Sequence, residues 1–192
     1  MLGQLHGLYL LCASSEGLVI VDQHAAHERL AYEELKAGLA RGRLPGQGLL
    51  SPATLELGPQ ESAWAAAQQE AWSRLGLELE PFGGNTWVVR SLPVVAAGAD
   101  PEELVRGLLA ELGRAGLAPR TPEFLEAALK GLACRSAIKS GQQLSRGEME
   151  GLVARAAALP PPVTCPHGRP VFLVLSRRDL ARWFKRSLEP LP

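Results

Sequence analysis

Several common signals are missing from this chain of 192 residues. No run of 18 consecutive apolar residues occurs, so we expect no membrane-spanning segment. The first residues lack the charged start and the cleavage site of a signal peptide. Cysteine is scarce: its three copies are too few for a disulfide framework and fit a reducing cytosol, where thiols stay free or bind metal. We therefore expect a cytoplasmic protein.

The motifs of several enzyme classes are absent as well. The sequence contains no His-Glu-x-x-His helix of metalloproteases, no glycine-rich phosphate loop and no Gly-x-Ser-x-Gly turn. The His-x-Glu and Pro-Cys-x-x-Cys signature of the zinc nucleobase deaminases is also missing. The sequence thus gives no support for these activities.

A net charge is lacking too, because 20 Lys and Arg balance 20 Asp and Glu. The balance is uneven along the chain. Residues 1–134 carry 10 basic and 16 acidic side chains, whereas residues 135–192 carry 10 and 4. A basic end on a neutral protein is compatible with a polyanion partner such as nucleic acid, although such asymmetry is common without one.

Hydrophobic residues, by contrast, make up 46% of the chain, enough for a substantial core. The apolar runs Leu5–Ala13 and Leu18–Val21 predict a hairpin, and Asp22 should cap a helix that continues to about residue 39. Prolines and glycines predict a loop over residues 42–52, and Ala53–Leu57 predicts a short strand.

The middle of the chain predicts both helices and a hairpin. A helix should run from Pro59 to about residue 75, because proline suits the first turn of a helix. Gly83-Gly84-Asn85 predicts the turn of a second hairpin. Two more helices are expected, one beginning at Pro101 and one capped by Thr121.

The end of the chain returns to a mixed order. Ser145 should cap a helix that ends at about residue 159, before a run of three prolines. Val171–Leu175 predicts a buried strand, and Ser176 with Asp179 predicts the capping box of a final helix. Because strands and helices do not alternate regularly, we expect an α+β fold.

Residues 22–28, Asp-Gln-His-Ala-Ala-His-Glu, concentrate potential metal ligands at the start of the first predicted helix. His24 and Glu28 are four residues apart and should share one face, one turn apart. Asp22 stands where a strand ends, and we expect His24 and Glu28 as ligands in preference to His27. An isolated His-x-x-x-Glu pair is nevertheless more often an ordinary helix surface.

Residues 165–170, Cys-Pro-His-Gly-Arg-Pro, form a second group of ligands. Cys165 and His167 flank a proline, so their sulfur and nitrogen atoms could reach one ion, and a thiolate with an imidazole favours zinc over magnesium. On its own, this stretch is as compatible with no metal as with one. Cys12 and Cys134 would each be expected as a buried small apolar side chain.

Together, these stretches resemble the C-terminal domain of the MutL family of mismatch-repair proteins. Residues 22–33 have the spacing of the family's endonuclease motif. Residues 133–135, Ala-Cys-Arg, and the stretch 165–170 are similar to the other two motifs, in the same order. The opening residues 2–9 and the ending 176–180 also resemble the family, so that the resemblance covers essentially the whole chain.

The resemblance implies a homodimeric domain with two subdomains. Residues 1–46 and 146–192 would form a dimerisation subdomain that carries most of a metal site, and residues 47–145 would form an external α/β subdomain inserted between them. Zinc would bind tightly, and manganese or magnesium would support cleavage. Asp22 and Glu28 would be catalytic, and the implied metal ligands are Asp22, His24, Glu28, Cys134, Cys165 and His167.

The function implied by the resemblance is metal-dependent nicking of duplex DNA in mismatch repair, by a bacterial, nucleoid-associated protein. The full-length family protein also has an N-terminal ATPase domain, of which this chain shows no trace. Some relatives lack the motifs and only dimerise. The alternative is therefore a non-catalytic dimerisation module whose zinc is structural.

The segment around residue 47 matches the place of the family's clamp-binding motif. Ligands of the replication sliding clamp are extended peptides with a leading Gln and apolar anchors, which would here be Gln47, Leu49 and Leu50. The alternative is an ordinary linker whose leucines pack on the external subdomain.

The final predicted helix has an apolar stripe and a basic side. Leu180, Trp183, Phe184 and Leu188 would suit a core or a dimer seam. The basic side could neutralise DNA phosphates in a salt-sensitive manner, or it could be a solvated face. Arg169 could likewise contact phosphate or brace its own loop. The candidate DNA-binding residues are Arg169, Arg178, Arg182, Lys185 and Arg186.

Overall fold

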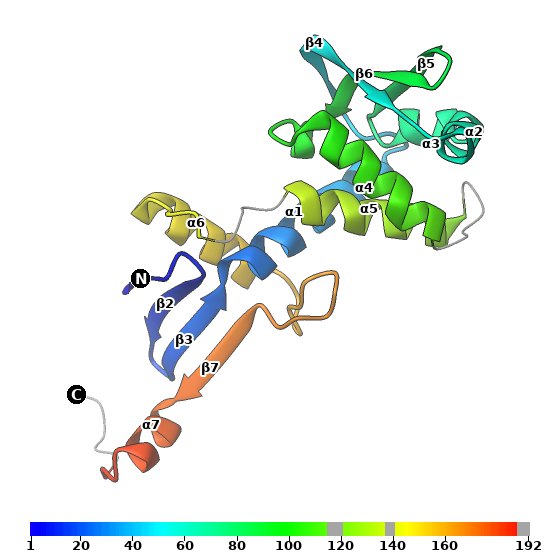
Figure 1. The fold of residues 1–192 in the computed structure, drawn as a ribbon. Coiled ribbons are helices and arrows are strands. Elements are labelled where there is room, and N and C mark those ends of the chain that lie inside the picture. Colours follow the sequence, from blue (N-terminus) through cyan, green and yellow to red (C-terminus); the bar gives the residue numbers. More distant parts are fainter. Residues whose placement is uncertain (115–120, 137–140, 188–192) are drawn as a thin grey trace. The chain divides into compact units, whose positions relative to one another are not determined.

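A computed structural model describes residues 1–114, 121–136 and 141–187. Helices and antiparallel sheets together form the chain, which confirms the expected α+β fold. The chain divides into two compact units, a first unit of residues 1–30 and 138–192 and a second unit of residues 31–137 (Figure 1).

The first boundary between the units lies inside helix α1 (Gln23–Ala40), whereas residue 46 was expected. The physical reason is that Ala31, Tyr32 and Leu35 in the second half of α1 pack into the hydrophobic core of the second unit. The second boundary, at residues 137–138, precedes the expected position at 145–146. The roles of the two units as dimerisation and external subdomains stay predictions.

The first unit contains a four-stranded antiparallel sheet in the order β1-β2-β3-β7. β2 (Tyr9–Ser14) and β3 (Gly17–Asp22) form the predicted hairpin. The expected first run is interrupted, because His6 and Gly7 adopt positive φ angles of 54° and 64° and turn the chain from β1 (Gly3–Leu5) into β2. β7 (Phe172–Ser176) pairs with β3, so a strand from the last part of the sequence joins strands from the first part in one sheet.

One face of this sheet packs on helices and forms the core of the first unit. The beginning of α1 and helix α6 (Arg146–Ala157) contribute to this core. Ser145 caps α6 as predicted, since its hydroxyl accepts a hydrogen bond from the backbone of Glu148. The most deeply buried residues of the core are Leu10, Val21, Ala25, Ala26, Ala156 and Val171.

The second unit contains a three-stranded antiparallel sheet in the order β4-β6-β5. The prediction of a loop over residues 42–52 is wrong from residue 46 onward, because β4 spans Gly46–Glu56. β4 pairs with β6 (Thr86–Pro93) on both sides of a register shift between Gly48 and Ala53. The predicted second hairpin is confirmed by β5 (Glu78–Gly83) and β6.

Helices complete the second unit. The helix expected over residues 59–75 is divided at Gln68 into α2 (Pro59–Ala67) and α3 (Gln69–Arg74). A short 3₁₀ helix, η1 (Val94–Ala96), follows β6. Helices α4 (Pro101–Arg114) and α5 (Pro122–Ser136) begin as predicted and lie side by side on one side of the sheet (Figure 1). The largest side chains of the core are Trp72, Trp87 and Phe124.

The final helix is shorter than predicted. α7 spans Arg177–Trp183, and Ser176 caps it as expected by accepting a hydrogen bond from the backbone of Asp179 at 3.1 Å. Lys185 has a φ of 51°, and the amide of Arg186 bonds to the carbonyl of Ala181, which closes the helix. Lys185 and Arg186 therefore follow α7 and are not part of it, and Leu188 lies outside the described residues.

Within the described ranges, none of the helices is both long and apolar enough to span a membrane. The three cysteines all belong to these ranges, and none of them forms a disulfide.

Candidate metal centre

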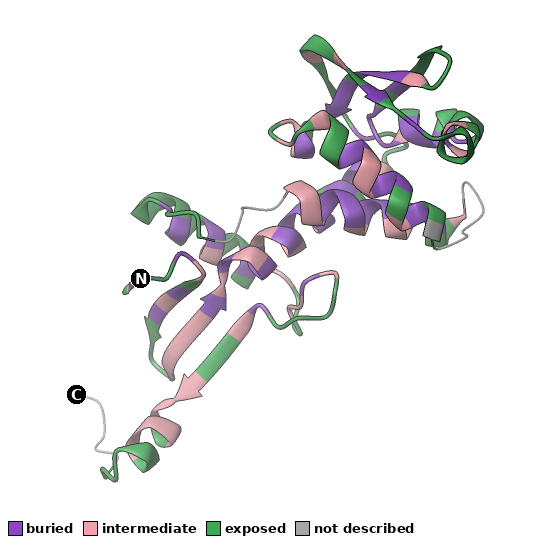
Figure 2. Cartoon of the chain, in the orientation of Figure 1, coloured by how far each residue is buried: buried purple, intermediate pink, exposed green. Residues whose placement is uncertain are grey.

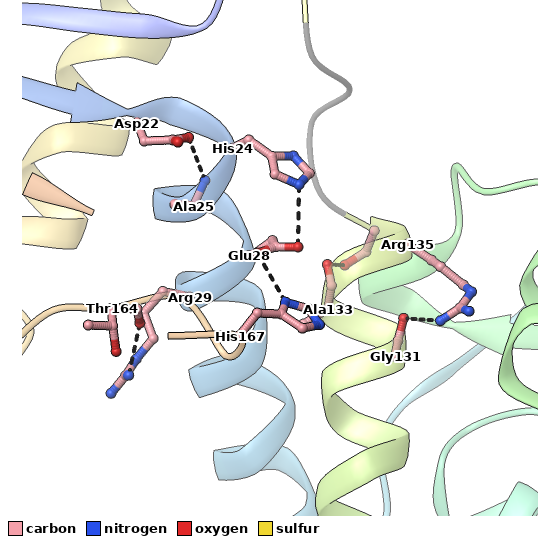
Figure 3. Close-up of polar contacts among 11 residues, drawn as sticks. Asp22, His24, Ala25, Glu28, Arg29, Gly131, Ala133, Arg135, Thr164 and His167 are labelled. Atoms are coloured by element: carbon pink, nitrogen blue, oxygen red, sulfur yellow. Dashed lines mark hydrogen bonds and ion pairs between the residues drawn. The ribbon is translucent and has the colours of Figure 1, made fainter. Parts of the chain in front are cut away.

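The first turn of α1 presents the first group of predicted ligands. Asp22 ends β3 and caps α1, since its Oδ1 accepts a hydrogen bond from the backbone N–H of Ala25 at 2.9 Å. One turn further along, Nε2 of His24 lies 3.3 Å from Oε1 of Glu28. The predicted shared face of His24 and Glu28 is therefore confirmed, and Figure 3 shows the two side chains pointing toward each other.

The second group of ligands lies on a tight loop before β7. The amide of Cys165 donates to the carbonyl of Arg169 at 2.8 Å, and the amide of Gly168 donates back to the carbonyl of Cys165 at 2.9 Å. Gly168 has a φ of 86°, a conformation that glycine adopts without strain. The closed loop fixes Cys165 and His167 close to each other.

The fold brings the two groups together. One ligand atom from each of Glu28, Cys165 and His167 lies within 4.8 Å of the other two. Oε2 of Glu28 is 3.6 Å from Nδ1 of His167, so the two carboxylate oxygens face two different imidazoles (Figure 3). All of these residues belong to the first unit.

Burial makes this grouping chemically specific. The side chain of Glu28 is only 2% exposed, and Cys165 is 2% exposed as well. A buried carboxylate is strongly disfavoured unless a cation or hydrogen-bond donors compensate its charge. A thiolate, an imidazole and a carboxylate are the three side-chain types that bind zinc in proteins. The residues present thus fit a divalent metal ion.

The remaining predicted ligands have different positions. His24 adjoins the group through Glu28, whereas Asp22 caps the helix one turn earlier. Neither belongs to the three-residue group within 4.8 Å that the described residues form. Cys134 is half-buried on α5 in the second unit. The roles of these residues as ligands stay predictions.

Arg29 is a contributor that the sequence did not reveal. Its Nη1 donates to the backbone carbonyl of Thr164 at 3.1 Å and so ties the loop that carries Cys165 to the helix that carries Glu28. A contact from an arginine to a backbone carbonyl 135 residues away leaves no periodic signal in a sequence. The sequence shows only that Arg29 directly follows Glu28.

The predicted clamp-binding segment lies on β4 of the second unit. Gln47 pairs with Leu92 of β6, and its side chain is exposed. Leu49 is partly buried and packs against the core of the second unit, as the linker alternative expected. Leu50 is fully exposed to solvent. The segment therefore presents Gln47 and Leu50 on the surface.

The candidate DNA-binding residues are all exposed. Arg169 lies on the same loop as His167, whereas Arg178 and Arg182 are on α7. Nη2 of Arg182 lies 3.6 Å from Oδ1 of Asp179. The hydroxyl of Ser176 donates a hydrogen bond to Asp179 and holds the pKa of this carboxyl below its ordinary value. One carboxylate therefore stays ionised among these basic side chains.

The outer face of the first sheet, which points away from the core, is apolar. Residues directly opposite each other on neighbouring strands share a face, so the register places Leu11 beside Ile20 and Ile20 beside Leu173. Leu173 is 55% exposed, and Figure 2 shows exposed and half-buried residues along β2, β3 and β7. The apolar residues that the register places on the outer face are Leu5, Tyr9, Leu11, Ala13, Leu18, Ile20, Leu173 and Leu175.

Known proteins similar to this chain share one description. Residues 2–144 match the family of the MutL C-terminal dimerisation domain. The DNA mismatch repair protein MutL of Geobacter sulfurreducens is 42% identical over 186 residues, which are 97% of this chain and 31% of that protein. The MutL protein of Trichlorobacter lovleyi is 39% identical over 97% of this chain and 32% of its own length.

A further relative is the MutL protein of Paramagnetospirillum magneticum, which is 40% identical over 95% of this chain and 30% of that protein. The chain thus spans about a third of the length of the curated relatives that it matches. The family match covers most of the chain and contains both halves of helix α1. The chain belongs to the family of MutL C-terminal dimerisation domains of DNA mismatch repair.

Proposed function

We propose that this domain is a metal-dependent endonuclease that nicks duplex DNA during mismatch repair and acts as a homodimer. The observation that carries the proposal is the environment of Glu28. This carboxylate is 2% exposed, has an imidazole near each of its oxygens and lies within 4.8 Å of the thiol of Cys165. Such a concentration of ligands inside a unit is expensive to fold unless it serves a bound cation.

The ligand types suggest how the residues divide their roles. Cys165, His167 and His24 would hold zinc, because thiolate and imidazole prefer that ion, with Cys134 as a further ligand implied by the resemblance. Glu28 has two oxygens and would contact two ions, and Asp22 offers the oxygen ligation that suits manganese or magnesium. Bound metal ions would supply a hydroxide nucleophile and stabilise the leaving oxygen of the phosphodiester.

Substrate binding would depend on exposed positive charge. Arg169 is on the loop of the candidate centre and would contact a phosphate of the DNA backbone near the scissile bond. Four other residues would add sequence-independent, salt-sensitive affinity: Arg178, Arg182, Lys185 and Arg186.

The dimer would form through the outer face of the first sheet. Exposed apolar patches of this kind mark interaction surfaces, and the family is described by its dimerisation. Trp183 and Phe184, which are 57% and 73% exposed, would extend the apolar surface beyond β7. A second copy of the chain is the partner that the family description supports.

Other partners belong to the whole protein. The replication sliding clamp would bind the β4 segment through Gln47 and Leu50, with Leu49 anchored in the core. An N-terminal ATPase domain and a location at the bacterial nucleoid are implied by the resemblance to full-length MutL. The implied ATPase domain would lie outside the third of the relatives' length that this chain spans.

Nicking of supercoiled plasmid in the presence of Mn²⁺ and the sliding clamp tests the proposal. Asp22→Asn should abolish nicking, because asparagine removes the negative charge that binds the metal but can still cap α1. Asp100→Asn is a matched control, since Asp100 also caps a helix by accepting from the third residue on, Glu103, but lies in the second unit. This control should nick like the wild type.

The result also separates the proposal from its alternative. Full nicking by Asp22→Asn, with the dimer intact, would rule out the assigned centre. A wild-type protein that binds zinc and dimerises but never nicks plasmid would instead support a non-catalytic dimerisation module with structural zinc.

A further inference from the structure

A buried glutamine stands between two of the candidate metal residues. Gln23 is only 1% exposed, although it is the first residue of α1 and lies between Asp22 and His24. Burying an uncharged amide is unfavourable unless its donors and its acceptor are all satisfied. The hydrogen-bond partners of the Gln23 side chain therefore show why a glutamine can be buried at this position.

The amide of Gln23 is fully used, together with that of a second glutamine on β1. Nε2 of Gln23 donates to the carbonyls of Gly7 at 2.8 Å and Gln142 at 3.1 Å, while its Oε1 accepts from Nε2 of Gln4 at 2.6 Å. Gln4 also donates to the carbonyl of Gln142 at 2.8 Å, and its own Oε1 accepts from the amide of Leu144 at 3.2 Å. We call these two side chains the glutamine pair.

The carbonyl groups that the glutamine pair binds are themselves held tightly. Gly7 has a φ of 64°, and a Cβ at this position would lie only 2.7 Å from the backbone of Gly141. The amide of Gly141 donates to the carbonyl of Gly7 at 3.1 Å. The turn before β2 and the segment 141–144 therefore meet backbone to backbone, and no side chain could separate them.

The first turn of α1 is also fixed through its backbone. The amide of Asp22 donates to the carbonyl of Val171 at 3.0 Å, and the amide of Gln23 donates to the carbonyl of Leu8 at 3.1 Å. Successive residues of a helix project about 100° apart. Anchoring the side chain of Gln23 on one side of the helix therefore sets the direction in which His24 projects, while Asp22 is held next to it as the cap of α1.

We propose that Gln23 is a positioning residue for the candidate metal centre, which it orients through its own hydrogen bonds to the carbonyls of Gly7 and Gln142. This inference rests on the proposed function, because it assumes that the centre binds metal. Gln23 would not touch the metal or the DNA. Its buried amide would hold Asp22 and His24 in place relative to Glu28, and it would make that placement depend on the segment 141–144, which belongs to the same unit.

Zinc affinity, measured by competition with a chelator, tests the proposal with a readout other than activity. Gln23→Met keeps the length of the side chain but removes all of its hydrogen bonds, and we expect zinc affinity to fall about tenfold or more, as is usual when a group that orients metal ligands is lost. Gln4→Met is the matched control. It disrupts the same glutamine pair from β1 and should lower the melting temperature while leaving zinc affinity within about twofold.

Gln142→Ala is a second control, because only the backbone carbonyl of Gln142 takes part and its side chain is exposed. Should Gln23→Met fail to fold, Gln23→Asn replaces it; it keeps the amide but retracts it by one methylene, and the same loss of affinity is expected. Unchanged zinc affinity in a folded Gln23 variant would overturn the positioning role alone, as would an equal loss in Gln4→Met. A wild-type protein that binds no zinc would overturn the proposed centre as well.

Discussion

At the scale of single residues, Glu28 is the most informative position. Its side chain is almost fully buried, yet it carries a carboxylate whose oxygens lie 3.3 Å and 3.6 Å from two imidazoles. An apolar residue would fill this position of α1 at a lower cost, since a buried charge must be compensated. The buried charge therefore indicates that Glu28 serves to bind a cation and not to fill the core.

Cysteine substitutions should separate binding from packing. Cys165→Ser should lower zinc affinity by about a hundredfold or more, because serine does not offer a thiolate and loss even of an orienting group costs about ten- to a hundredfold. Cys12→Ser is the control: Cys12 is a buried cysteine in the core of the same unit but lies outside the group of Glu28, Cys165 and His167. Zinc titration and thermal unfolding of both variants measure the two effects.

The two cysteine variants should differ in which property they change, zinc affinity or thermal stability. Cys12→Ser should bind zinc normally and unfold at a lower temperature, since a hydroxyl replaces an apolar thiol in the core. Equal zinc affinity in Cys165→Ser and the wild type would exclude Cys165 as a ligand.

How far the sequence predicts the centre depends on the range of each contact. His24 and Glu28 were predicted to share a face, because helical periodicity determines that relation locally. The approach of Cys165 and His167 to Glu28 came only from the resemblance, since it depends on the pairing of β7 with β3. The contacts of Arg29 and Gln23 could not be predicted, because their partners are backbone carbonyls far away in sequence.

At the scale of elements, β4 shows where local patterns are insufficient. Two prolines and two glycines in residues 45–52 predicted a loop. The structure pairs residues 46–48 and 53–56 with β6 and accommodates residues 49–52 in the register shift between them. Pairing with a neighbouring strand outweighs turn propensity here, and no pattern within residues 42–52 reveals that neighbour.

The exposed part of β4 gives a test at the same scale. Gln47→Ala should weaken binding to the sliding clamp about tenfold or more, because it removes the leading polar anchor of the segment while leaving the backbone pairing with Leu92 intact. Gln60→Ala is the control, since Gln60 is another exposed glutamine of the second unit, on α2. Surface plasmon resonance with immobilised clamp measures both, and equal affinity of the two variants would remove the assignment.

At the scale of the whole molecule, the two segments of the first unit explain the organisation of the fold. β7 completes a sheet begun by the first 22 residues, so residues 31–137 are inserted between two parts of one unit. The sequence indicated this arrangement only through the resemblance. The expected boundary at residue 46 differs from the boundary between the units at residue 30, because α1 continues across the latter without a break.

The outer face of the first sheet leads to a prediction about assembly. Leu173→Asp should shift the protein from dimer to monomer at micromolar concentration, because a symmetric interface contains each substitution twice and would bury both charges. Phe82→Asp, at a side chain 70% exposed in the second unit, should remain dimeric. Size-exclusion chromatography with light scattering distinguishes the two, and a dimeric Leu173→Asp variant would place the interface elsewhere.

The proposed dimer through this outer face would have a consequence for the choice of DNA strand. Two copies that associate through one shared face are related by a twofold axis, and the strands of a duplex, which run in opposite directions, are related in the same way. Each copy of the candidate centre would then meet an equivalent strand. The proposed symmetric dimer would therefore hold no information about which strand is new, and that information would have to come from a partner that binds the dimer in only one orientation.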